Sequence, residues 1–302
     1  MRTVIALGGN AIASGAHPTV ADQRARIRET VGPIRELTQR GYDVVLTHGN
    51  GPQVGTLLLQ QEQMDAPERP LDVLVAETQA QIGYLLAGEL DDRLDTRVVT
   101  LLTRVHVDPD DPDFENPSKP VGPHYSETEA AAKPFETGPV RRPDGERAYR
   151  RLVPSPRPQE VLEADEIQAL VERGATVVCG GGGGVPVVDT GGGTEGVEAV
   201  VDKDHTTSLL AREVDAETLV MATDVEYVYR DFGTAEQEPI EAVDAAAMGQ
   251  ALDRGEFSAG SMQPKVEACL DFLDAGGERA VVTSLDRIGA AVDGDAGTQI
   301  YP

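Results

Sequence analysis

Short apolar runs that end at glycine recur along the chain. Residues 2–7 form one such run, which stops at Gly8-Gly9-Asn10, and a second run ends at Thr47 and leads into His48-Gly49-Asn50-Gly51. A third run, residues 175–179, leads into five consecutive glycines. Runs of this length and character predict buried strands that are covered on both faces.

Segments with helical periodicity separate these runs. The clearest is predicted over 19–40, with Thr19 as its N-terminal cap and Gly41 as its stop. Its apolar face would contain Val20, Ile27, Val31, Ile34 and Leu37. Further helices are predicted at 53–63, from Asp72 onward, and at 159–173, 206–214, 244–254, 266–273 and 285–291, and further strands at 42–47, 98–103, 185–188, 218–222, 279–283 and 298–300. This alternation predicts an α/β fold with a mainly parallel sheet covered by helices.

The stretch from Asp108 to Pro158 has a different texture. It is rich in Pro, Asp, Glu and Arg and shows little strand or helix periodicity outside residues 128–134. It is too long for an ordinary connection in a compact domain, so it is either a functional subdomain resembling a lid or a disordered insert. Residues 116–123 are stiffened by three prolines that surround Lys119. We therefore expect a subdomain rather than disorder.

The three glycine corners favour an anion site. A strand that ends in glycine lets backbone N–H groups approach an anion closely, and a following helix adds the partial positive charge of its N-terminus. In a parallel sheet the three corners would share the carboxyl edge. A single corner is most often a plain connection, but three of them favour a shared phosphate or carboxylate ligand.

The charge of the chain excludes a general nucleic-acid binder. Asp and Glu number 52 against 26 Lys and Arg, which leaves a formal net charge of -26. Only four of the cations are lysine: Lys119, Lys133, Lys203 and Lys265. An acidic surface depleted of lysine suggests a halophilic source, because concentrated salt screens the self-repulsion of such a charge.

The few lysines also point to chemistry. Three of the four lie in what we predict to be loop motifs: 116–120, 202–204 and 261–265. An ammonium group is a compact point charge that can contact a transferring phosphoryl oxygen, whereas a guanidinium is a broad planar fork. Chance would explain one surviving lysine easily, but it explains three of four poorly.

Other classes of site find little support. The chain has no P-loop motif, no set of protein-kinase signatures and no histidine spacing typical of zinc. His48 is as readily a hydrogen-bonded structural residue as a catalytic one, and Cys179 is better explained as a small buried side chain than as a nucleophile. No apolar run is long enough to span a membrane and no secretory leader is visible, so we expect a soluble cytoplasmic protein.

Several motifs together resemble those of the carbamate kinases of the amino-acid-kinase superfamily. The most specific is Asn116-Pro117-Ser118-Lys119-Pro120, which the kinases of acetylglutamate, glutamate, aspartate or UMP are not expected to contain. The resemblance covers residues 4–302 and also rests on residues 6–11, 47–55, 153–156, 181–186, 196–204, 223–225, 259–262 with 264–265, and 297–299. Two positions depart from the pattern: Ser118 replaces a common Thr, and Gln263 replaces a frequent Gly, which puts the shape of the loop before Lys265 in question.

The resemblance implies an open αβα sandwich and a homodimer. It implies one amino-acid-kinase domain over 1–302, with a carbamate lobe at 1–204, a protruding subdomain at about 108–156 and a nucleotide lobe at 205–302. The implied reaction is reversible phosphoryl transfer between ATP and carbamate with Mg2+. In arginine fermentation such enzymes make ATP from ADP and carbamoyl phosphate.

The resemblance also implies roles for individual residues. Lys119 would reach the substrate from the subdomain, and Lys203 and Lys265 would hold the nucleotide phosphates, oriented by Asp204. The carbamoyl-phosphate site would contain Gly8, Gly9, Asn10, Gly49, Asn50, Gly51, Gly181, Gly182 and Gly183. The nucleotide pocket would contain Thr223, Asp224, Tyr229 and Met262 besides Lys203 and Lys265. No residue is assigned as a protein ligand of the metal.

Two alternatives remain open from the sequence. The acceptor could be another small carboxylate or phosphate, or the chain could be a catalytically silent regulator that binds a nucleotide or carbamoyl phosphate. The proline-rich Lys119 segment argues against the first alternative. The presence of all three motif lysines argues against the second.

Overall fold

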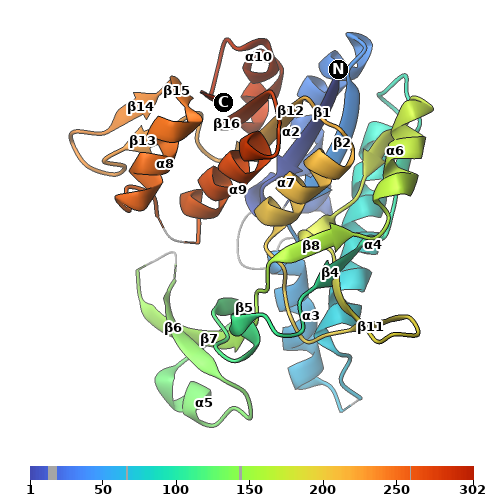
Figure 1. Ribbon diagram of the computed structural model, residues 1–302. Helices are drawn as coiled ribbons and strands as arrows, with labels where there is room; N and C mark the ends of the chain where they lie inside the picture. Colours follow the sequence, from blue (N-terminus) through green and yellow to red (C-terminus); the bar gives the residue numbers. More distant parts are fainter. Residues whose placement is uncertain (13–18, 66, 143–144, 259) are drawn as a thin grey trace.

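A large, mainly parallel sheet forms the centre of the molecule (Figure 1). The computed structural model describes residues 1–12, 19–65, 67–142, 145–258 and 260–302. Within these residues β16 pairs antiparallel with β17, and the other neighbouring strands of the sheet are parallel. In spatial order the strands are β15 (Ala242–Asp244), β17 (Thr298–Tyr301), β16 (Arg279–Ser284), β12 (Thr218–Thr223), β1 (Arg2–Leu7), β2 (Asp43–His48), β9 (Thr176–Val178) and β3 (Val98–Thr100). The predicted α/β fold class is confirmed.

Helices cover both faces of this sheet. Successive side chains of a strand point to opposite sides, and in the central strands the side chains on both sides are apolar and need to be covered. In β1, Val4 and Ala6 belong to one apolar core, while Ile5 and Leu7 belong to the other. The first core is closed by α6 (Ala164–Glu172), α7 (Lys203–Glu213), α8 (Ala245–Asp253) and α9 (Met262–Asp274). The second is closed by α2 (Val20–Gln39), α4 (Leu71–Leu90) and α10 (Ile288–Asp293). Among the described helices, none combines the length and apolar character needed to cross a bilayer.

A second, smaller sheet lies beside the carboxyl-terminal end of the main one. Its strands, in spatial order, are β11 (Thr194–Gly196), β10 (Val185–Asp189), β4 (Arg104–Val107) and β8 (Pro158–Val161). A third apolar core packs α3 (Gly51–Gln63) and α4 against β10 and against the segment that follows β4. The remaining short elements are α1 (Gly9–Ile12), η1 (Pro112–Phe114), η2 (Gly181–Gly183), β13 (Val228–Arg230), β14 (Glu238–Ile240) and η3 (Leu285–Arg287).

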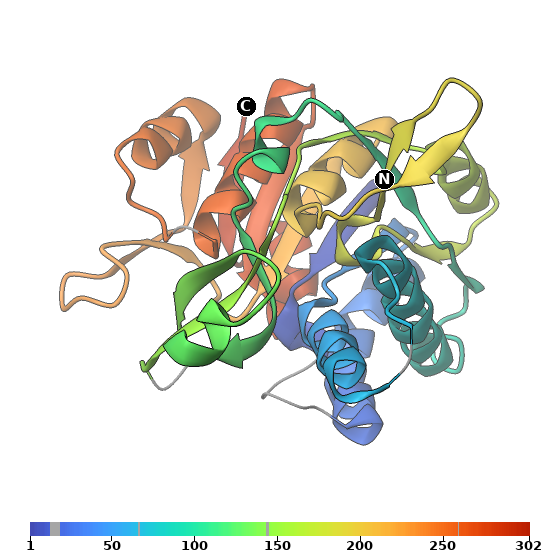
Figure 2. The ribbon, with the colours of Figure 1, turned by 90° about the horizontal axis from the view of Figure 1, so that it is seen from below.

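The segment between β4 and β8 is better ordered than its sequence pattern suggests. It forms a three-stranded antiparallel sheet with one short helix, here called the small module: β5 (Lys119–Tyr125), α5 (Glu127–Ala131), β6 (Thr137–Arg141) and β7 (Arg147–Val153). The sequence pattern predicted a subdomain here but none of its individual strands. Since β5 lies at the edge of this sheet, its prolines remove few ladder hydrogen bonds. The module projects beyond the main sheet (Figure 1), and the view from below shows it beside α3 (Figure 2).

Several predicted boundaries also differ from the structure. The helix predicted over 159–173 begins at Ala164, because Pro158–Val161 pairs with β4 as a strand. The strand predicted over 98–103 ends at Thr100, and a separate strand of the smaller sheet, β4, begins at Arg104. Val20 is 52% exposed, so it does not belong to the buried face of α2. The first two differences arise from strand pairing with distant segments, which local periodicity does not report.

A cluster of charges connects α2 to α4. Glu89 of α4 pairs with Arg24 and Arg28 of α2 at 2.9 and 2.8 Å, and with Arg93 at 3.2 Å. The Glu89 side chain is only 4% exposed. The hydrogen bond from Arg28 outweighs the effect of burial and holds the pKa of Glu89 at about 2, below the ordinary 4.5.

Glu89→Gln is expected to lower the free energy of unfolding by about 1–2 kcal/mol near neutral pH, since three partly exposed arginines lose their charged acceptor. A folded-state pKa below the ordinary value favours the ionised form in the folded protein. The stabilisation by the Glu89 carboxylate is therefore complete above about pH 4.5 and is lost as the pH falls toward about 2. Denaturant unfolding of both proteins at constant salt would measure it, and a difference that stays constant through this pH range would contradict it.

Candidate active site

The first two glycine corners meet at the carboxyl edge of the main sheet. The Gly49 N–H donates to the Leu7 carbonyl oxygen at 3.1 Å, which joins the end of β2 to the end of β1. A Cβ atom at Gly49 would lie 3.3 Å from the Cα and the backbone nitrogen of Gly9, and 3.8 Å from Cδ of Lys203. On the other side, the Gly8 N–H donates to the Ala222 carbonyl oxygen of β12 at 3.0 Å. A side chain at Gly8 or Gly49 would therefore crowd the neighbouring backbone, and glycine fits at both positions without a shift.

The third glycine corner packs against the second. A Cβ atom at Gly181 would lie 2.5 Å from the His48 ring, and one at Gly182 would overlap the side-chain amide of Asn50. The Asn50 amide donates to Thr78 Oγ1 at 2.9 Å, so its position is fixed from the other side as well. Gly181–Gly183 thus lies directly against the loop that follows β2, as expected for corners of one parallel sheet.

His48 has a structural environment. Its ring is 1% exposed, and its Nδ1 lies 3.1 Å from the Gly49 carbonyl oxygen, to which Nδ1–H donates. Burial lowers the pKa of His48 to about 4, so the ring is neutral near neutral pH. Of the two interpretations left open by the sequence, the geometry favours a hydrogen-bonded structural histidine that shapes the second glycine corner.

Asp204 lies between two of the motif lysines. One carboxylate oxygen pairs with Lys203 Nζ, and the other accepts a hydrogen bond from Lys265 Nζ at 3.0 Å. The exposed fractions of these side chains are 6% for Asp204, 14% for Lys203 and 13% for Lys265. Burial alone would raise the pKa of Asp204, but the two ammonium charges outweigh it and the pKa lies below the usual range. One ionised carboxylate therefore fixes two ammonium groups close together at the glycine corners.

Both lysines belong to helices rather than to loops, and in this respect the sequence prediction was wrong. Lys203 is the first residue of α7, and Lys265 lies in the first turn of α9. Asp202 caps α7 by accepting a hydrogen bond from the Asp204 N–H at 2.8 Å, so the helix begins three residues earlier than predicted. Pro264 is tolerated in the first turn of α9, where its missing N–H would have no intrahelical partner.

Asp202 also binds the third motif lysine. Lys119 Nζ donates to Asp202 Oδ2 at 2.9 Å, across 83 positions of sequence. Burial would raise the pKa of Asp202, but the Lys119 charge outweighs it and holds the pKa well below its usual range. From the sequence, either aspartate beside Lys203 could hold lysines in position, but only Asp204 was placed in the predicted site; in the structure both bind a motif lysine. The available signal was the position of Asp202 directly before Lys203, where an aspartate can cap a helix.

The remaining predicted site residues are placed less closely together. Thr223 ends β12 beside Gly8, where a Cβ would lie 3.8 Å from the Thr223 Cα, and Asp224 follows it. Tyr229 lies in β13, with its ring centroid 6.3 Å from that of Tyr227. Met262 begins α9 and packs against the core on that face. Gly51 begins α3, and the side chain of Asn10 lies outside the part of the chain that is described.

This combination of a parallel sheet, glycine corners and paired lysines agrees with a sequence match over most of the chain. The model of the family described as "Amino acid kinase family" matches residues 1–284. The chain belongs to the amino acid kinase family.

Relatives within the amino acid kinase family cover nearly the whole chain. A carbamate kinase from Halobacterium salinarum is 48% identical over 301 residues, 99% of this chain and 98% of that protein. A carbamate kinase from Pyrococcus furiosus is 42% identical, over 100% of this chain and 99% of that protein. The structure of the carbamate kinase from Giardia lamblia bound to AMP-PNP is 38% identical and superposes with a TM-score of 0.89, covering 99% of this chain and 98% of that one. The resemblance inferred from the motifs is confirmed.

Proposed function

We propose that this protein is a carbamate kinase, which transfers a phosphoryl group reversibly between ATP and carbamate. The observation that carries the proposal is the lysine arrangement: Lys203 and Lys265 share Asp204, and Lys119 binds the adjacent Asp202. These groups lie at the glycine corners of a chain that matches carbamate kinases from end to end. In the direction of ATP formation, ADP would attack carbamoyl phosphate.

In this proposal the chain supplies alignment and charge compensation. The N–H groups of the glycine corners, including Gly9 and Gly49, would cradle the carbamoyl phosphate, with Gly181–Gly183 nearby. Lys203 and Lys265 would contact the oxygens of the transferring phosphoryl group and the neighbouring nucleotide phosphates. Such a transfer depends on in-line placement and on compensation of charge spread over the phosphoryl oxygens.

No general base is needed for this reaction. A carbamate oxygen is already anionic at neutral pH, so no proton has to be removed before it attacks phosphorus. Neutral, buried His48 fits this view, because it orients a glycine corner and is not placed to exchange a proton with solvent. Asp204 is committed to two lysines, which also argues against its acting as a base.

Mg2+ would enter with the nucleotide. Among the described residues no group of three or more His, Cys, Asp or Glu side chains is placed to hold a metal. Mg2+ commonly retains waters and binds substrate phosphates through few protein ligands, so this site fits a metal that arrives bound to ATP or ADP. When bound, the ion would offset phosphate charge that the lysines leave uncompensated.

The lobes and the nucleotide pocket belong to the same proposal. Residues 1–204 would form the carbamate lobe, with the small module as its protruding subdomain at about 108–156, and residues 205–302 the nucleotide lobe. Thr223, Asp224, Tyr229 and Met262 would surround the nucleotide. AMP-PNP in the Giardia lamblia relative supports a nucleotide site in this fold. We further propose a homodimer, as the resemblance implies, which light scattering would test, and a cytoplasmic location, as expected from the sequence.

The deciding experiment is ATP formation from ADP, Mg2+ and carbamoyl phosphate in concentrated potassium chloride, with acetyl phosphate as the control donor. ATP from carbamoyl phosphate alone would support the proposal. Equal or greater use of acetyl phosphate would indicate another acceptor class. Absence of ATP from either donor, in protein shown to be folded, would favour a binding protein without catalysis.

Lys119→Ala is expected to raise the KM for carbamoyl phosphate about tenfold while leaving the KM for ADP nearly unchanged. Lys119 lies in β5 of the small module, whereas the lysines proposed to bind the nucleotide phosphates lie in α7 and α9. Its loss should therefore weaken the binding of carbamoyl phosphate and leave the binding of ADP unchanged. Initial rates with each substrate varied in turn would show the difference. Unchanged KM and kcat for carbamoyl phosphate would remove Lys119 from the site.

The net charge of -26 predicts that the protein needs salt to remain folded. The Debye length grows from roughly 3 Å at 1 M salt to roughly 30 Å at 0.01 M, so repulsion among surface carboxylates increases as salt is removed. We expect circular dichroism to show unfolding on dialysis into dilute buffer. Full stability there would count against a halophilic source.

A further inference from the structure

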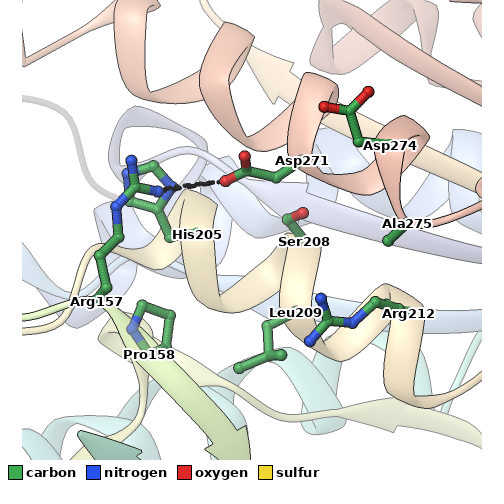
Figure 3. Close-up of a pocket in the computed structure, with 9 residues that line it drawn as sticks. All are labelled: Arg157, Pro158, His205, Ser208, Leu209, Arg212, Asp271, Asp274 and Ala275. Carbon is green, nitrogen blue, oxygen red and sulfur yellow. Dashed lines mark hydrogen bonds and ion pairs between the residues drawn. The ribbon is translucent and has the colours of Figure 1, made fainter. Parts of the chain in front are cut away.

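The outer surface between α7, α9 and β8 contains a pocket of about 390 Å³ (Figure 3). Arg157 and His205 lie together at one end, with the guanidinium directed toward Asp271, and Arg212 lies at the other end. His205, which lies beside Arg157 in this pocket, directly follows Asp204 in the sequence. The pocket therefore adjoins the helix turn that carries the paired lysine and aspartate.

Arg157 joins the two helices that carry Lys203 and Lys265. Its Nη1 donates to Nδ1 of His205 on α7 at 2.7 Å, and it pairs with Asp271 and Glu267 of α9 at 3.3 and 3.6 Å. Since His205 Nδ1 accepts this bond, its Nε2 carries the proton and faces Glu267 Oε2 at 3.5 Å. Burial, and then the neighbouring Arg157 charge, lowers the pKa of His205, which agrees with a neutral ring.

The position of Gln263 extends this cluster toward Lys265. The Gln263 side-chain amide donates to Glu267 Oε1 at 2.9 Å, one turn along α9. The residue that departs from the family pattern is thus tied to the carboxylate that faces Arg157 and His205. The first turn of α9 is held in place by the same group of contacts.

Arg157 also lies at the end of the neck, defined here as residues 111–119 and 153–157, which connects the small module to the body. Asp113 Oδ2 accepts from Ser118 Oγ at 2.8 Å and from the Ser155 N–H at 2.7 Å. Asp111 Oδ2 accepts from the Arg157 N–H at 3.0 Å, and Lys119 is paired with Val153 in the sheet. The two halves of the neck are therefore bound to each other.

The neck thus contacts the first turn of α7 at two points. Lys119 binds Asp202, which caps the helix, and Arg157 binds His205, its third residue. Lys203 and Asp204 lie between these two contacts. Arg157 adds the contact to α9, so a single guanidinium connects the neck and both lysine-bearing helices.

We propose that Arg157 is a positioning residue for phosphoryl transfer: it holds the first turns of α7 and α9 at the spacing at which Asp204 binds both Lys203 and Lys265. This inference rests on the proposed carbamate kinase activity. Arg157 would touch no substrate, so its loss should lower kcat and leave substrate binding nearly intact. A small displacement of groups that contact the reacting atoms reduces rate strongly.

The test compares Arg157→Ala with Arg212→Ala, which removes the same side chain from the other end of the same pocket. We expect kcat for ATP formation to fall about tenfold in Arg157→Ala, with both KM values within about twofold of wild type. Arg212→Ala should retain the wild-type kcat. Millimolar guanidinium should restore part of the lost kcat in Arg157→Ala, and no such recovery is expected in Lys203→Ala.

Hydrogen exchange of the amides of residues 202–206 gives a readout that does not depend on activity. Exchange should be faster in Arg157→Ala than in Arg212→Ala, measured in the same salt. Equal kcat and equal exchange in the two variants would overturn the inference, as would a loss confined to KM. Absence of ATP formation by the wild-type protein would instead refute the proposed function. If Arg157→Ala does not fold, Asp271→Asn takes its place, with a severalfold fall in kcat expected and equality with Arg212→Ala as the contrary result.

Discussion

Lys203→Ala and Lys265→Ala are each expected to lower kcat for ATP formation by about a hundredfold or more, equivalent to roughly 3 kcal/mol in the barrier. Each ammonium group is partly buried and fixed by Asp204, close to the glycine corners, so it is organised before the substrate binds. A donor of this kind acts on charge that develops in the transition state, without any cost of reorganisation at that moment. Stopped-flow or coupled measurement of kcat with saturating substrates would give the value.

The fourth lysine of the chain provides a matched control. Lys133 lies in the small module, paired with Glu62 at 2.7 Å and placed 4.2 Å from the centroid of the Tyr125 ring. Lys133→Ala removes the same positive charge from the same protein at a position outside the proposed site, and we expect near-normal kcat. We do not expect Lys203→Ala or Lys265→Ala to unfold the protein, because each variant leaves Asp204 with one lysine partner. Near-normal kcat in both Lys203→Ala and Lys265→Ala would remove these residues from the transfer step.

The glycine corners could be predicted from the sequence because their signal is local. The apolar side chains of a six-residue segment such as Arg2–Leu7 predict a buried strand, and the glycines that follow indicate a close approach of backbones. Parallel strands then bring their carboxyl ends to one edge by topology alone. The motif lysines could be predicted for a different reason: lysine is rare in this sequence, and three of its four lysines lie in recognisable motifs.

What the sequence did not show depends on contacts between distant segments. Lys119 reaches Asp202 across 83 positions, and Arg157 reaches Asp271 across 114. The strands of the small module are rich in proline and arginine, and they are stabilised by antiparallel pairing and by the packing of Val121 and Val153 against α3. Local periodicity carries no record of such pairings, so the neck and its contacts with α7 appeared only in the structure.

Gly183→Ala is expected to lower the free energy of unfolding by about 3 kcal/mol or more and to reduce kcat as well. Gly183 has φ +90°, a conformation that strains residues with a Cβ atom, and its added Cβ would overlap the Val201 carbonyl oxygen. Because this obstacle is backbone, it cannot rotate away as a side chain would. Val201 directly precedes Asp202 and Lys203, so relief of the overlap would displace the start of α7.

Gly191→Ala separates the overlap from the backbone strain. Gly191 has a similar positive φ of +75°, but an added Cβ would meet nothing within 4 Å. This variant should lose only about 1 kcal/mol, the ordinary cost of placing alanine in the left-handed region, and should retain full activity. Thermal and denaturant unfolding of the two variants in the same salt, followed by kcat, would compare them. Equal losses of stability would mean that α7 can shift away from Gly183 without cost. The packing of the third glycine corner against the first turn of α7 would then not determine the position of Lys203.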